Sequence, residues 1–162
     1  MRKKYPFLLL ALVIVIGISF PNVMTLIKQT KLERQSVQNH QDTLKRVVAY
    51  LNRKQSPLSE DEASLLLKQK HWRLLIGLMG IESQFCRRQL GYNCFGLGGD
   101  SAYRHYNNFS ESIIDADALI TRWQKKGRWL TVADMNGHYV QPFNENWERV
   151  VNKILKEIQP FY

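Results

Sequence analysis

The N-terminal end of the chain restricts its architecture more than any other feature. Three basic residues at positions 2–4 precede an almost unbroken apolar run from Phe7 to Phe20, and apolar residues resume over positions 23–27. As a single helix, Tyr5–Ile27 would be about 34 Å long, which exceeds the roughly 30 Å hydrocarbon core of a bilayer. The sequence therefore predicts an N-terminal transmembrane helix within residues 1–27.

The basic cluster also predicts the orientation of this anchor. The positive-inside rule places the N-terminus in the cytoplasm and residues 28–162 outside, in a single-pass protein of the cell membrane. A cleaved signal peptide is the alternative, because the strictly apolar run is short. Its only small-x-small cleavage sequence, Gly17-Ile18-Ser19, lies inside the apolar run. Both interpretations export the remainder of the chain.

The positive charge of the chain is concentrated near this segment. The 23 Lys and Arg residues exceed the 14 Asp and Glu residues, for a net charge of +9. Residues 1–46 hold eight basic and two acidic side chains, whereas residues 47–162 hold fifteen and twelve. A nucleic-acid-binding protein would cluster its basic excess on the folded domain, so we expect no nucleic-acid partner. A mildly basic domain suits an anionic polymer such as a cell wall.

Helical periodicity dominates the exported part. Residues 28–41 are polar, lack Gly and Pro, and predict a stalk, either helical or loose; residues 42–162 predict one mainly α domain. Ser59 with Glu62 forms a capping box. Apolar residues at helical spacing predict helices over residues 42–54, 59–70, 72–85, 108–127 and about 147–158. The glycine- and aromatic-rich segment 86–107 has no helical period and predicts a small irregular or β lobe.

The only two cysteines, Cys86 and Cys94, lie in this lobe with seven residues between them. Outside the cytoplasm, so close a pair most economically forms a disulfide, with free thiols as an alternative. A metal site would need further ligands at regular spacing, and His71, His105 and His138 are scattered. We therefore expect a disulfide, no metal and no cofactor.

Glu82 is an acidic residue that local rules do not explain. It ends an apolar helix in phase with Leu75 and Leu78, so it points along the buried face. Partial burial disfavours the charged carboxylate and raises its pKa, which suits a general acid. The alternative is a structural glutamate paired with Arg87, Arg88 or Arg104.

Four short motifs, the first of which contains Glu82, follow one another along the chain in a recognisable order. They are Ile81-Glu82-Ser83-Gln84-Phe85, Asn93-Cys94-Phe95-Gly96-Leu97-Gly98-Gly99, Tyr103-Arg104-His105-Tyr106 and Asn108-Phe109-Ser110-Glu111-Ser112. Tyr139 then precedes the last helix. Together they resemble the glucosaminidase family (glycoside hydrolase family 73) of the lysozyme-like superfamily, across about residues 72–155.

This resemblance implies a lysozyme-like domain over residues 42–162 that cuts the glycan strands of peptidoglycan as an endo-β-N-acetylglucosaminidase, with Glu82 as its catalytic acid. It implies a substrate-binding set made of Ser83, Asn93, Phe95, Gly96, Tyr103 and Tyr139. The Glu-Ser pair also occurs in lytic transglycosylases of the same superfamily, which are the nearest alternative. An inactive wall-binding module at the membrane is a third.

Asp100 is the one candidate for a second catalytic carboxylate on the lobe. Members of the family often carry such a residue, and no other acidic side chain occurs between Cys94 and Tyr103. A Gly-Gly-Asp-Ser turn also favours Asp for turn chemistry alone. Without a second carboxylate, the 2-acetamido group of the substrate can act as the nucleophile.

Overall fold

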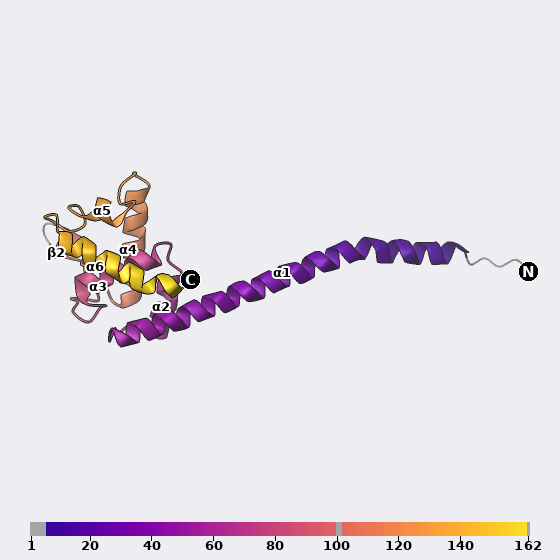
Figure 1. Ribbon diagram of the computed structural model, residues 1–162, viewed down its shortest axis with the longest axis horizontal. Helices are drawn as coiled ribbons and strands as arrows, with labels where there is room; N and C mark the ends of the chain where they lie inside the picture. The colour runs from indigo at the N-terminus through magenta and orange to yellow at the C-terminus, as the bar shows by residue number, and fades with distance from the viewer. Residues whose placement is uncertain (1–5, 100–101, 162) are drawn as a thin grey trace, which may run out of the picture. The chain divides into compact units, whose positions relative to one another are not determined.

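The computed structural model describes residues 6–99 and 102–161, and of residues 6–23 only the backbone. Contacts within the chain separate two compact units, Met1–Asp42 and Thr43–Tyr162. Helix α1 (Pro6–Arg53) supplies everything described in the first unit, and its last turns belong to the second (Figure 1).

The predicted stalk, residues 28–41, is helical and its side chains are exposed. The predicted anchor within residues 1–27 falls mostly on residues 1–23, whose side chains lie outside the described part of the chain. Among the residues that are described, no helix combines the length and apolarity needed to cross a membrane. The anchor and the single-pass topology thus stay predictions.

The second unit is mainly α, as the periodicity predicts. After α1 come α2 (Glu60–Leu67), α3 (Trp72–Ser83), α4 (Phe109–Gln124), α5 (Val132–Met135), α6 (Glu145–Ile158) and the short 3-10 helix η1 (Gln159–Phe161). The predicted lobe forms two very short antiparallel strands, β1 (Gly98–Gly99) and β2 (Ala102–Tyr103). The rest of this lobe, as far as it is described, is turns and loops.

Local capping explains where two of the helices begin. The capping box is confirmed, since the Glu62 N–H donates to Ser59 Oγ at 3.3 Å and the Ser59 N–H donates to Glu62 Oε2 at 2.7 Å. This helix ends at Leu67, one turn earlier than its composition predicts. Asn108 caps α4 by accepting a hydrogen bond from the Glu111 N–H at 2.9 Å.

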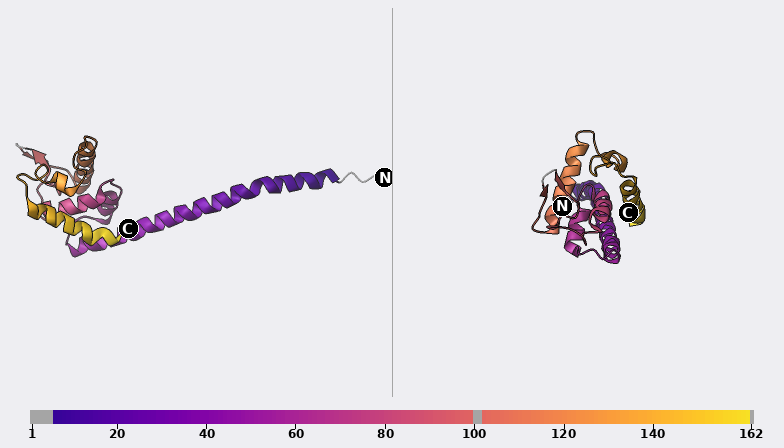
Figure 2. Two further views of the ribbon diagram at one scale, coloured as in Figure 1. Left: turned by 45° about the horizontal axis from the view of Figure 1, so that its top comes forward. Right: turned by 90° about the vertical axis from the view of Figure 1, so that its left-hand side faces the viewer.

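Helix α3 lies at the centre of the unit, with α6 packed along it (Figure 2). Leu75, Leu78 and Met79 of α3 are completely buried, as is Val151 of α6. Gly80 allows the close approach, because a Cβ there would lie 2.4 Å from the Ile154 side chain. This packing brings the last turn of α3 next to the first turn of α6.

Candidate active site

Glu82 lies in the last turn of α3, between α6 and the loop formed by residues 93–97. Its Oε1 accepts a hydrogen bond from the Trp147 indole N–H at 2.7 Å. Its Oε2 lies so near Gly96 that a Cβ on that residue would be 2.8 Å away. Gly96 has a φ of +62°, so both its backbone conformation and the adjacent carboxyl favour glycine.

Burial raises the pKa of Glu82 above its ordinary value, and the hydrogen bond from Trp147 lowers it in part. The net effect is that Glu82 keeps its proton to a higher pH than an exposed glutamate. The alternative ion pair with an arginine is not observed in the described part of the chain. Arg87 bonds to Gln55 and Gln84, and Arg104 pairs with Asp115.

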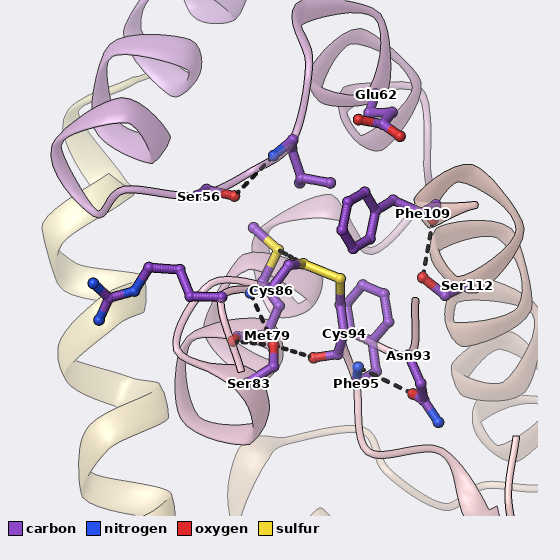
Figure 3. Close-up of a disulfide and its surroundings, with 12 residues drawn as sticks. Ser56, Glu62, Met79, Ser83, Cys86, Asn93, Cys94, Phe95, Phe109 and Ser112 are labelled. Carbon is purple, nitrogen blue, oxygen red and sulfur yellow. Dashed lines mark hydrogen bonds between the residues drawn. A yellow bond between two sulfur atoms is a disulfide. The ribbon is translucent and has the colours of Figure 1, made fainter. Parts of the chain in front are cut away.

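The loop beside Glu82 is closed by Asn93, whose side chain is only 3% exposed. The amide nitrogen of Asn93 donates to the carbonyl oxygens of Leu97 (2.6 Å) and Arg104 (3.0 Å). Its oxygen accepts from the N–H groups of Leu97 (2.9 Å) and Phe95 (3.3 Å), the second of which is drawn in Figure 3. Four hydrogen bonds use the whole amide, so Asn93 holds the loop and has no bonding capacity left for a ligand.

A disulfide and Ser83 join this loop to the end of α3 (Figure 3). Cys86 and Cys94 are bonded, with their Cα atoms 4.7 Å apart, which confirms the predicted disulfide. Ser83 is 2% exposed; its hydroxyl donates to the Cys94 carbonyl at 2.7 Å and accepts from the Cys86 N–H at 2.9 Å. We therefore expect Ser83, like Asn93, to act on a ligand through the loop rather than by contact.

Tyr139 connects the loop before α6 to the loop of residues 93–97. Its hydroxyl donates to the carbonyl oxygen of Phe95, whose own ring is completely buried. Burial and the neighbouring charge of Glu82 raise the pKa of Tyr139 well above its ordinary value, so this hydroxyl stays neutral. The Tyr139 ring also packs on Trp147 with a centroid distance of 5.9 Å.

Tyr103 and Asp100 complete the predicted set. Tyr103, on β2, is 57% exposed and interacts electrostatically with Tyr139, so its ring lies open to solution near the site. Asp100 falls in the gap between residues 99 and 102 and lies outside the described residues. Its role as a second carboxylate stays a prediction.

Trp147 and Asn136 are the site residues that the sequence did not identify. The apolar face of the last helix includes Trp147, and a buried indole N–H usually finds an acceptor, but no local pattern says which one. The sequence around Asn136 indicates only an Asn-Gly turn. Its buried amide in fact fixes the loop before α6, accepting from the Asn144 N–H at 2.8 Å and donating to the Asn144 carbonyl at 3.0 Å.

Within the described part of the chain, no three His, Cys, Asp or Glu residues gather into a cluster that could hold a metal ion. Comparisons with protein-family models, with curated proteins and with solved structures found no match to this chain. Two loops, each held by a buried asparagine, meet beside the shielded carboxyl group of Glu82, which among the described residues receives one N–H donor.

Proposed function

We propose that the exported domain cleaves glycosidic bonds in the glycan strands of peptidoglycan, as an endo-β-N-acetylglucosaminidase with Glu82 as the general acid. The observation that supports this most directly is the setting of Glu82. Its carboxyl group is partly buried, has a raised pKa, and has one oxygen, Oε2, without a hydrogen-bond partner among the described residues. A general acid needs a proton held ready near the pH at which the enzyme works.

In the proposed reaction, Glu82 transfers its proton to the glycosidic oxygen while the bond from that oxygen to the anomeric carbon breaks. The positive charge that develops on the sugar is met by the oxygen of its own 2-acetamido group, which bonds to the anomeric carbon, or by the carboxylate of Asp100. Water then attacks the anomeric carbon, and the Glu82 carboxylate takes up the proton that water releases. The second step thus returns Glu82 to its protonated form.

The surroundings of Glu82 support this chemistry. Tyr103 offers an exposed aromatic face of the kind on which a pyranose ring can pack. Gly96, which has no Cβ, lets the loop lie close to Oε2 without displacing it. The disulfide, Ser83 and Asn93 hold this loop in place, and pre-organisation of this kind is what positions a reacting group.

Product analysis of purified peptidoglycan digested by the full-length protein in detergent tests the proposal. Mass spectrometry should find fragments with reducing N-acetylglucosamine ends. Anhydro-N-acetylmuramic acid ends would replace the hydrolase with a lytic transglycosylase that uses the same acid. The absence of any fragment would contradict the enzyme and favour a wall-binding module.

The role of Glu82 is tested by Glu82→Gln, which keeps the size of the side chain and removes the proton. We expect the rate to fall by about 10²–10⁴-fold, as is typical for lost acid–base catalysis, while the folded protein still binds glycan. Glu111→Gln is the matched control, because the Glu111 carboxylate is used to bond Asn107 ahead of α4. A Glu82→Gln variant that folds normally and stays within a few-fold of wild type would refute the mechanism.

A further inference from the structure

Trp147, whose indole contacts Glu82, is itself held in place. Its side chain is 3% exposed, and its backbone N–H donates to the Asn144 side-chain oxygen at 3.1 Å in the N-terminal cap of α6. Asn144 is held in turn by the buried Asn136. Hydrogen bonds outside α3 thus hold the first turn of α6, and the 2.7 Å bond joins this turn to the last turn of α3, which carries Glu82.

This bond makes the two carboxyl oxygens of Glu82 unequal. An indole N–H is a donor only, so the oxygen that it contacts, Oε1, must act as an acceptor. In a protonated carboxyl group the carbonyl oxygen is the better acceptor, which leaves the proton for the other oxygen. That oxygen is Oε2, which faces Gly96 and the loop of residues 93–97.

We propose that Trp147 is the positioning residue of this site: its indole N–H holds Oε1 of Glu82, so that the proton to be delivered lies on Oε2, beside Gly96. The catalytic meaning of this assignment rests on the proposed function. The contact itself and its effect on Glu82 can be measured without any turnover.

The charged and titratable groups around Glu82 determine the sign of the expected effect. Burial raises the pKa of Glu82 and the Trp147 bond lowers it. Tyr139, in the loop before α6, interacts electrostatically with Glu82. Its hydroxyl stays neutral because its own pKa is raised. Tyr103, on β2, and Tyr106 in turn interact electrostatically with Tyr139. Loss of the indole donor should therefore raise the pKa of Glu82 further.

Trp147→Phe removes the N–H and keeps an aromatic ring against Tyr139. Trp129→Phe is the matched control, since Trp129 belongs to the same row of rings, 5.5 Å from Tyr139, and does not bond to Glu82. We expect Trp147→Phe to lower kcat on peptidoglycan about tenfold with little change in KM, because an acid free to rotate is less often aligned. The alkaline limb of its pH profile should move to higher pH, and that of Trp129→Phe should not.

The same two variants, labelled with ¹³C at the glutamate carboxyl groups, allow the pKa of Glu82 to be followed by NMR. An increase in Trp147→Phe alone supports the proposal, and an unchanged pKa together with an unchanged pH profile overturns it. A wild-type protein that does not cut peptidoglycan would overturn the proposed function, while the carboxyl titration would still decide the contact.

If Trp147→Phe does not fold, the wild-type indole resonance gives the answer. The Trp147 N–H signal should titrate with the pKa of Glu82 and lose that titration in Glu82→Gln. A signal that is insensitive to pH through the Glu82 transition would refute the assignment.

Discussion

Replacement of Gly96 by Ala separates the geometry at Glu82 from the general stability of the fold. Gly96 and Gly127 both have left-handed backbones, with φ values of +62° and +70°. A Cβ at Gly96 would lie 2.8 Å from Oε2 of Glu82, whereas a Cβ at Gly127 would meet nothing within 4 Å. The two Ala variants thus share the backbone strain and differ in one contact.

The expected magnitudes follow from this comparison. A left-handed conformation costs a non-glycine residue about 1–2 kcal/mol, and the reduced freedom of the unfolded chain returns roughly 0.4–1 kcal/mol, so both variants should lose about 1 kcal/mol of unfolding free energy. The extra contact at Gly96 adds little to this loss, because the end of the Glu82 side chain can shift by a few tenths of an ångström. That shift should weaken its bond to Trp147 and lower activity by roughly 10–100-fold.

Urea denaturation and the rate of peptidoglycan digestion should be measured on the same preparations of Gly96→Ala and Gly127→Ala. The indole N–H resonance of Trp147 provides a third observable that needs no substrate, and it should move in Gly96→Ala only. Equal activities in the two variants, or an indole signal unaffected by Gly96→Ala, would show that Oε2 does not lie beside Gly96 as described.

Three further predictions concern the same region. Asn93→Ala removes four hydrogen bonds from a buried loop and should cost about 2–4 kcal/mol of unfolding free energy in urea; a loss under about 1 kcal/mol would contradict the network. Joint replacement of Cys86 and Cys94 by Ser should cost about 2.5 kcal/mol by the loop-entropy relation and lower activity more than stability, so a variant with full activity would argue against a role for the crosslink. Because burial raises the pKa of Glu82, wild type should lose stability relative to Glu82→Gln as the pH rises from 4.5, the ordinary pKa of glutamate, through the raised pKa in the folded protein. The measurement is the melting temperature of both proteins across this pH range. A constant difference between the two melting temperatures would refute the burial argument.

Much of this architecture follows from local patterns. The capping box of Ser59 and Glu62 depends on groups three residues apart, so sequence spacing alone predicts it. Cys86 and Cys94 are so close in the chain that their pairing could be predicted from proximity, together with the predicted export of the domain. The burial of Glu82 follows from its phase with Leu75 on one helix.

Helix ends were less predictable, because they depend on single backbone conformations. Helix α3 ends at Ser83, two residues before the predicted end. It stops there because the next residue, Gln84, takes a left-handed conformation with a φ of +52°. The lack of a helical period predicts an irregular segment after this helix. Nothing in that pattern indicates that Asn93 would close it by bonding to both Leu97 and Arg104.

Sequence alone therefore located the longer helices of the second unit apart from their exact ends, favoured pairing of Cys86 with Cys94, and placed Glu82 at the end of an apolar helix. It did not predict the four-residue helix α5. Only the tertiary structure decided what meets Glu82: Trp147 lies 65 positions further along the chain, and the Tyr139 hydroxyl reaches a carbonyl 44 positions before it. Periodicity and capping report interactions within a few residues, whereas the partner of a buried donor depends on how α3 and α6 pack. For the same reason Ser83 and Asn93, which the resemblance marks as binding residues, are found with their polar atoms committed to the loop beside Glu82.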